Sequence, residues 1–124
     1  MALIAPEVKR FIEGRDHLGW VCTVDSKGMP NVSPRFVLEI GPDWVAWGNS
    51  FTNKTFYNMG QNSSVTVGFA DYDRRTGYEL SGRVELIGSG ELFDRVCAKV
   101  MAKGFPRANK VSVLTVTQVR NLAK

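Results

Sequence analysis

The residues that could do chemistry in this sequence gather around one isolated lysine. Between residues 44 and 70 the chain carries a single charged side chain, Lys54, although 23% of the whole sequence is charged. A β-like run gives way at residues 48–50 to a helical stretch, so Lys54 is predicted to lie near a helix N-terminus. A cation at that position opposes the helix dipole, and its placement there favours a binding role over a purely structural one.

The same helix end offers several donors to an anion. The first backbone N–H groups of a helix lack intrahelical acceptors, and Ser50, Thr52 and Thr55 place hydroxyls on either side of Lys54. A bound phosphate would satisfy these groups together. We therefore predict a phosphate cradle over residues 49–55, NSFTNKT. The alternative is an N-capped surface helix with one solvated lysine, since hydroxyl caps are common at helix starts.

The hydrophobic pattern predicts a mainly β chain with short helices that position this cradle. Alternating apolar residues indicate six strands, at 18–24, 32–40, 44–47, 65–69, 78–86 and 111–119. Helical spacing indicates three helices, at 6–14, from the NSFTNKT segment to about Gly60, and between Gly90 and Gly104. Six strands with helices at these places predict a small antiparallel barrel, formed by residues 1–124 as a single domain.

Two predicted strands carry details that bear on function. In the strand 32–40 the even positions are apolar, so one face is expected to pack, and the other carries Ser33 and Arg35. Pro34 favours an edge position or a bulge. In the strand 78–86, Gly82 is expected to mark a bend or a close contact.

Composition excludes several classes of protein. The formal net charge is +4, a mild surplus that does not by itself indicate a nucleic-acid partner. Cys22 and Cys97 fit neither a disulfide framework nor a metal motif, His17 has no spacing for zinc, and both cysteines are predicted to be core residues. A cytoplasmic location and no membrane association are expected, since no signal peptide or run of about 20 apolar residues is present.

Around the cradle the sequence resembles a known family. The segments GMPNVSPRF, WVAWGNSFTNKT and QNSSVTVGF, with the order of elements over nearly the full length, resemble the FMN-binding split barrels related to pyridoxamine 5'-phosphate oxidase. The resemblance implies a split β-barrel, six-stranded, antiparallel and Greek-key-like, that binds FMN. It also implies a homodimer with two flavin sites at the interface, with residues 105–107 reaching over the flavin of the neighbouring subunit.

The resemblance assigns roles to particular residues. Lys54 and the hydroxyls near it are implied to bind the FMN phosphate, Ser33, Pro34 and Arg35 to line the flavin, and residues 47–49 to follow the ribityl chain and the ring. The implied site comprises Ser33, Pro34, Arg35, Trp47, Gly48, Asn49, Ser50, Thr52, Asn53, Lys54 and Thr55. Of the three tryptophans, Trp47 is the one expected beside the ring. Arg35 would add a positive charge for the phosphate or for the reduced flavin, or else would pair with Glu39 or another carboxylate on the surface.

Departures from the family limit the expected activity. The family often has an arginine where this chain has Asn53, and the chain stops at Lys124 without the substrate-binding segments of the oxidase, so a pyridoxamine phosphate oxidase is not expected. No catalytic side-chain pair stands out, and redox chemistry is left to the cofactor. We expect an electron carrier or a flavin-dependent reductase whose partner is NAD(P)H or a redox protein.

Two alternatives remain at this point. The same barrel could bind haem or a deazaflavin in place of FMN. The sequence alone barely distinguishes these three ligands. A nucleic-acid-binding barrel would need aromatic residues interleaved with basic ones along one groove. The basic residues of this chain lie mainly on predicted helices and turns, while its aromatic-rich middle has only Lys54, so no nucleic-acid partner is expected.

Overall fold

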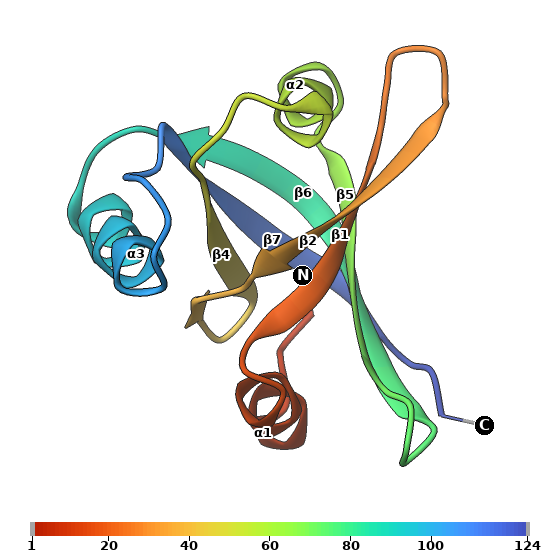
Figure 1. Ribbon diagram of the computed structural model, residues 1–124. Coiled ribbons are helices and arrows are strands. Elements are labelled where there is room, and N and C mark those ends of the chain that lie inside the picture. Colours follow the sequence, from red (N-terminus) through yellow and green to blue (C-terminus); the bar gives the residue numbers. More distant parts are fainter. Residues whose placement is uncertain (1, 124) are drawn as a thin grey trace.

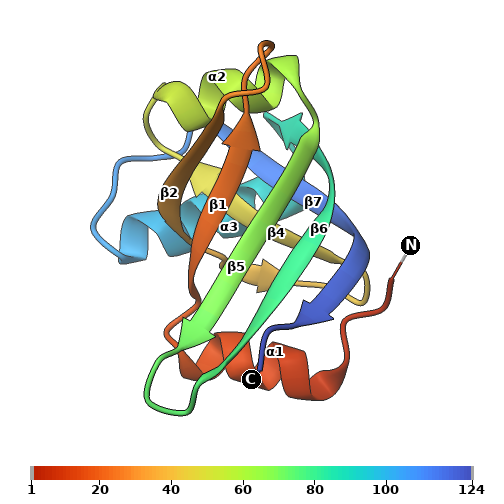
Figure 2. The same ribbon diagram turned by 90° about the vertical axis from the view of Figure 1, so that its right-hand side faces the viewer.

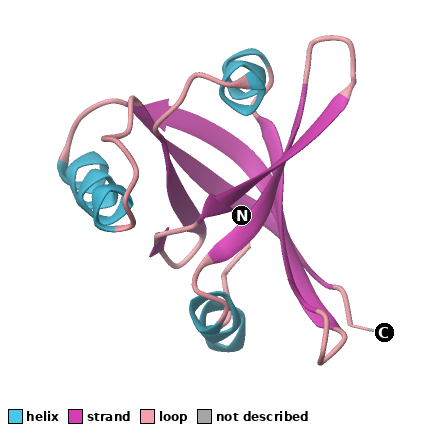
Figure 3. Ribbon diagram, in the orientation of Figure 1, coloured by secondary structure: helices cyan, strands magenta, loops and turns pink. Residues whose placement is uncertain are grey.

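The computed structural model describes residues 2–123 and shows one strongly curled antiparallel sheet with three short helices (Figure 1, Figure 3). The strands are β1 (Leu18–Val24), β2 (Pro30–Phe36), β3 (Glu39–Ile40), β4 (Trp44–Asn49), β5 (Ser64–Asp71), β6 (Thr76–Ile87) and β7 (Lys110–Asn121). The helices are α1 (Pro6–Gly14), α2 (Lys54–Gln61) and α3 (Glu91–Ala102). The predicted mainly β class and split barrel are confirmed, but the prediction of six strands is wrong, because the sheet has seven in the order β2-β1-β5-β6-β7-β4-β3.

The seventh strand comes from the segment predicted as one strand over residues 32–40. Its first part, β2, pairs with β1, whereas its last two residues, β3, pair with β4. Between them Val37 and Leu38 are buried, and the Leu38 N–H donates to the Ala46 carbonyl at 3.0 Å. Since β2 and β3 are the two ends of the sheet, this one segment joins both edges and curls the sheet into a barrel with an open seam.

The helices cover the remaining openings of the sheet. In Figure 2, α1 lies across one end of the curled sheet and α2 across the other. Ile12 of α1 and Met59 of α2 are buried in the barrel interior with Trp47 and Phe69. α3 packs against the outer side of β4, where a second apolar cluster forms from Leu38, Ala46, Phe93, Val96, Cys97, Val100, Ala108 and Val111. β4 is therefore buried on both faces and forms one fixed wall of the seam.

Two sequence details have clear structural reasons. A register shift falls between Ser81 and Gly82 of β6, opposite β7. A Cβ atom on Gly82 would lie 1.8 Å from the Thr115 carbonyl oxygen, so only glycine fits, and the predicted close contact is confirmed. Cys97 is buried as predicted, but Cys22 is only half-buried. Burial alternates along β1, and Val21 and Thr23 are the inward-facing residues, so Cys22 lies on the outer face.

Within residues 2–123, no helix has both the length and the apolar character needed to cross a lipid bilayer.

Candidate functional site

The polar side of β2 faces α2. The sequence instead predicted that the apolar side of this strand would be the packed one. Val32 is 54% exposed, while Asn31, Ser33 and Arg35 are half-buried. The Ser33 hydroxyl lies 2.7 Å from Thr55 Oγ1, and Asn31 Nδ2 donates to the same oxygen at 2.9 Å. Alternation identified the two faces correctly, but β2 is an edge strand whose inner side meets a helix through hydrogen bonds and not through an apolar core.

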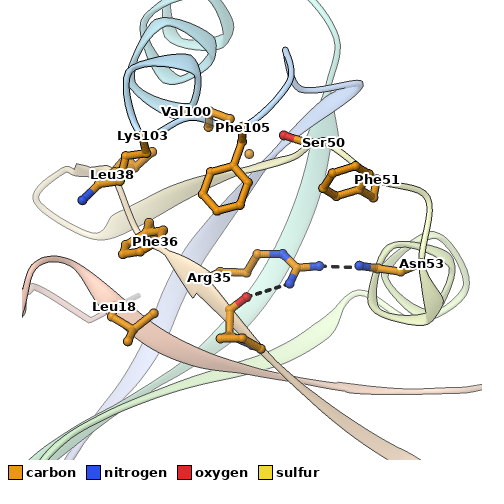
Figure 4. Close-up of a pocket in the computed structure, with 12 residues that line it drawn as sticks. Leu18, Arg35, Phe36, Leu38, Ser50, Phe51, Asn53, Val100, Lys103 and Phe105 are labelled. Carbon is orange, nitrogen blue, oxygen red and sulfur yellow. Dashed lines mark hydrogen bonds between the residues drawn. The ribbon is translucent and has the colours of Figure 1, made fainter.

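Arg35 extends from this polar side toward the start of α2 (Figure 4). Its Nη1 donates to Ser33 Oγ at 2.9 Å and to the Pro34 carbonyl at 2.7 Å, and its Nη2 donates to Asn53 Oδ1 at 3.3 Å. Burial lowers the pKa of the guanidinium, which still remains charged at neutral pH.

All three acceptors of the guanidinium are neutral. Among residues 2–123, no carboxylate forms an ion pair with Arg35, and Glu39 pairs instead with Lys99 and Arg95. The alternative in which Arg35 pairs with Glu39 is therefore wrong, and the half-buried positive charge of Arg35 has no protein counter-ion in the described chain.

A pocket of about 300 Å³ opens at the seam between β2 and β4, and we call it the seam pocket. It is lined by Leu18, Pro34, Arg35, Phe36, Leu38, Gly48, Ser50, Phe51, Asn53, Val100, Lys103 and Phe105. Two of these residues are cationic and none is acidic, and four are aromatic or proline. The pocket therefore suits an anionic ligand with an extended apolar part.

The start of α2 forms one border of the seam pocket. Asn53 is the N-cap, and its Oδ1 accepts the Phe56 N–H at 3.1 Å. Lys54 is the first helical residue, which confirms its predicted place near a helix N-terminus, and its side chain is exposed. No intrahelical carbonyl can reach the N–H groups of Lys54 and Thr55 at the first two positions of a helix. These two donors and the helix dipole make this border favourable for negative charge.

The charge of Lys54 also acts on the neighbouring β1–β2 turn. Backbone N–H groups of Met29 and Lys27 lower the pKa of Asp25, and the positive charge of Lys54 lowers it further. Lys54 does not line the seam pocket itself. Its side chain therefore contributes a solvated charge at the border, whereas Arg35 contributes a desolvated one inside.

The predicted hydroxyls of the cradle have different surroundings. Ser50 lines the seam pocket, but its Oγ donates to the Pro106 carbonyl at 2.7 Å. Thr55 is 1% exposed and its hydroxyl joins Asn31 to Ser33. Thr52 is exposed. Two of the three hydroxyls are thus already bonded within the protein, so they fix the walls of the pocket more than they offer donors to a ligand.

Trp47 and Asn49 lie on the side of β4 that faces the barrel interior. Trp47 is 0% and Asn49 1% exposed, and Asn49 Nδ2 donates to Ser112 Oγ at 2.8 Å. Trp47, which was expected beside the flavin ring, does not line the seam pocket, because alternation along β4 directs residue 47 into the core and Gly48 toward the pocket. A Cβ atom on Gly48 would lie 2.6 Å from Val100, so glycine is needed where α3 crosses this strand.

Sequence reasoning missed most of the apolar lining. Leu18, Phe36, Leu38, Val100 and Lys103 line the pocket but were not predicted as site residues, and Phe51 was included only as part of the segment 49–55. Phe105, expected to reach over the site of a neighbouring subunit, lines the pocket of its own chain. Phe36 follows Arg35 directly and could have been included on that ground. The residues at the end of α3 are distant in sequence, and no pattern indicates that they cover β2.

A second, open groove of about 670 Å³ lies between α1 and α3. Lys9, His17, Glu39, Lys99 and Lys103 are among its lining residues, and Lys103 lines the seam pocket as well. The His17 ring nitrogen Nδ1 lies 2.9 Å from the Val37 carbonyl. In the described part of the chain, no three His, Cys, Asp or Glu side chains come together as a metal site requires.

Comparison with known proteins identifies relatives of this architecture. The family described as Pyridoxamine 5'-phosphate oxidase matches residues 4–122. No curated protein matches the sequence. Among solved structures, the chain is similar to HupZ of Group A Streptococcus, with 24% identity, a TM-score of 0.88, and coverage of 98% of this chain and 96% of that chain.

Two further solved structures differ in the ligands that their names give. An FMN-binding protein from Syntrophomonas wolfei is 19% identical, with a TM-score of 0.75 over 95% of this chain and 90% of that chain. HutZ, the heme storage protein of Vibrio cholerae, is 16% identical, with a TM-score of 0.66 over 96% and 94%. At these identities the likeness concerns the fold.

Proposed function

Because this chain belongs to the pyridoxamine 5'-phosphate oxidase family, we propose that it is a flavoprotein that binds FMN in the seam pocket. Its role is electron transfer or flavin-dependent reduction, with NAD(P)H or a redox protein as partner. The observation that carries this proposal is Arg35, a half-buried guanidinium that lines the pocket and has only neutral acceptors among the described residues. A buried charge without a counter-ion is costly, and a phosphate would compensate it with charge-assisted hydrogen bonds.

The residues present fit FMN at both ends. Arg35, the N–H groups at the start of α2 and the nearby charge of Lys54 suit the phosphate. Phe36, Phe105 and the apolar side chains around them suit a planar ring. A bound flavin would supply the electron-transfer chemistry, and the protein would bind it, orient it and exclude water from it.

We also propose a homodimer that completes this site. On the outer face of β1 and β2, Leu18, Trp20 and Val32 are 43%, 53% and 54% exposed, and Trp20 lies opposite Pro34 in the strand register. Exposed apolar surface of this kind marks interaction sites. Leu18 and Pro34 belong both to this face and to the rim of the seam pocket. A second copy on this face would therefore also contact the ligand.

Haem is the second candidate, and the likeness to the Vibrio cholerae heme storage protein is what favours it. Haem iron in proteins is ligated by His, Cys, Met or Tyr side chains. None of the described residues that line the seam pocket is of these types, and His17 lies in the α1–α3 groove. A haem would need a ligand from a second copy, so FMN is the better match. A deazaflavin has similar charge requirements and remains an alternative.

The visible spectrum of purified protein and titrations with FMN and riboflavin test this proposal. We expect a flavin spectrum and tighter binding of FMN than of riboflavin, because the two ligands differ in the phosphate. Arg35→Ala should weaken FMN binding by about 1.5–3 kcal/mol, the range for a hydrogen bond to a charged group, and leave riboflavin binding nearly unchanged. Lys54→Ala should cost less, about 0.2–1 kcal/mol, because its charge is exposed.

The outcomes separate the candidates. Equal affinity for FMN and riboflavin, or an Arg35→Ala variant with unchanged preference, would contradict the phosphate site. A haem or deazaflavin spectrum after reconstitution with a cofactor mixture would replace FMN with that ligand. Steady oxidation of NAD(P)H by the FMN-loaded protein would favour a reductase over an electron carrier.

A further inference from the structure

The seam pocket has two chemically different ends (Figure 4). At one end the guanidinium of Arg35 points toward Asn53 and the start of α2. At the other end, Phe36, Leu38 and Phe105 provide an apolar lining, and Lys103 is the only charged side chain among the described lining residues there. A ligand with its phosphate at the first end would place its ring at the second, beside one cation.

Lys103 is held at this apolar end by two contacts. Its Nζ lies 4.3 Å from the centre of the Phe36 ring and 2.9 Å from Asp16 Oδ1. The Phe36 ring in turn lies 6.2 Å from the Phe105 ring, between centroids. Asp16 lines neither the seam pocket nor the α1–α3 groove. The ammonium of Lys103 thus lies over an aromatic ring that lines the pocket, and it is bonded to a carboxylate that lies outside the pocket.

The α1–β1 turn fixes Asp16 in this position. Asp16 and His17 have φ angles of 55° and 62°, in the left-handed region that few non-glycine residues adopt. His17 stabilises the turn, since its N–H donates to the Ile12 carbonyl at 2.9 Å and its own carbonyl accepts the Val37 N–H at 2.7 Å. The side chain of Asp16 is 77% exposed. Exposed ion pairs of this kind are weak, so Lys103 can exchange this partner for another.

We propose that Lys103 determines which oxidation state of the flavin the seam pocket binds more tightly. Its ammonium exchanges between Asp16 and the flavin ring, and it favours the reduced, negatively charged ring. This inference rests on the proposed function. A cation beside developing negative charge in a desolvated pocket stabilises that charge strongly, and charge placed near the ring is one of the means by which proteins tune a flavin. Asp16 competes with the ring for the ammonium and so sets how large this preference is.

The test compares dissociation constants for oxidised and reduced ligand in four variants of the full chain. Dithionite supplies the two electrons under anaerobic conditions, and solvent supplies the proton. In Lys103→Gln we expect the ratio of the reduced to the oxidised dissociation constant to rise about tenfold, for FMN and riboflavin alike. For a two-electron couple this corresponds to a potential about 30 mV more negative, measurable by spectroelectrochemistry.

Three further variants give the comparison its controls. Lys103→Arg should retain the wild-type ratio, because it keeps the charge. Asp16→Asn should lower the ratio about threefold, opposite in sign to Lys103→Gln, because it removes the competing carboxylate. Lys9→Gln removes the same charge from the α1–α3 groove, which Lys103 also lines, but Lys9 does not line the seam pocket. It should leave the ratio unchanged.

The results distinguish this inference from the proposed function. A wild-type protein that binds neither FMN nor riboflavin would overturn both. Normal FMN binding with the same ratio in wild type and Lys103→Gln would overturn only the role of Lys103. A Lys103→Gln variant that loses affinity for FMN but not for riboflavin would place the phosphate at the Lys103 end, and this too would overturn the proposal.

Discussion

At the scale of single residues, burial separates side chains that the sequence treats alike. Ser50, Thr52 and Thr55 are all hydroxyl residues beside Lys54, yet Thr55 is 1% exposed and Thr52 is exposed. The Thr55 hydroxyl is the point where β2 and α2 are joined by hydrogen bonds. Its role is to hold Arg35 and the start of α2 in register, so a change there should be felt first in stability.

Thr55→Val keeps the shape of the side chain and removes this hydroxyl. We expect it to lower the free energy of unfolding by about 1–3 kcal/mol, because polar groups of Asn31 and Ser33 lose a buried partner. Urea unfolding monitored by circular dichroism measures the change. Thr52→Val is the matched control and should alter stability by less than about 0.5 kcal/mol. Equal effects of the two substitutions would show that the hydroxyl of Thr55 does not connect the two elements.

At the scale of elements, α3 is fixed to the barrel seam by charge as well as by apolar packing. Lys99 and Arg95 of α3 both bond the Glu39 carboxylate on β3, and Lys99 also donates to the Leu38 carbonyl. The hydrogen bond from Lys99 is the main cause that lowers the pKa of Glu39, with Arg95 contributing to it. These contacts position the end of α3, which lines the seam pocket.

This ion pair predicts a pH dependence of stability. The pKa of Glu39 is lowered in the folded protein, so the stabilisation is fully present above the ordinary glutamate pKa of about 4.3 and is lost as the pH falls through the lower folded value. Glu39→Gln should therefore cost up to about 1 kcal/mol at pH 7 and less at about pH 3, below the ordinary glutamate pKa. Urea unfolding at both pH values checks this. The exposed Glu85 makes no ion pair in the described chain, and Glu85→Gln should show no such pH-dependent difference.

At the scale of the whole molecule, one face of the sheet lacks a cover. The helices close the two ends of the barrel and the outer side of β4, while the outer face of β1, β2 and β5 stays open (Figure 2). Trp20 projects there opposite Gly68 of β5, and a Cβ atom at Gly68 would meet no atom within 4 Å. An exposed tryptophan beside an open glycine position supports the two-fold interface proposed for this face.

Trp20→Glu tests the homodimer proposed on this face. We expect dimeric wild-type protein and monomeric Trp20→Glu in sedimentation velocity, because a charge would be buried in the interface. FMN binding should weaken in the variant, since Leu18 and Pro34 join this face to the seam pocket. Tyr72→Glu, at an aromatic residue that is 85% exposed in the β5–β6 turn, is the control and should remain dimeric. A Trp20→Glu dimer, or a monomeric wild type saturated with FMN, would contradict the proposal.

The sequence by itself determined the local features of this protein. Periodicity located the three helices and most strands, because hydrophobic spacing directly reflects which side of an element is buried. The sequence also predicted that Lys54 lies near the start of a helix and that Gly82 marks a bend or a close contact. Both features depend on a few neighbouring residues. Ser33 and Arg35 were correctly assigned to one side of their strand for the same reason.

Only the tertiary structure decided which of these features form a site. The segment 30–40 divides into β2 and β3 because it changes partners from β1 to β4, and a change of partner depends on strands distant in sequence. That division opens the seam, and the packing of α3 on β4 brings Lys103 and Phe105 to the pocket. Alternation along one strand cannot indicate what covers each face. Burial, and with it the electrostatic strength of Arg35 and Lys103, is a property of the assembled barrel.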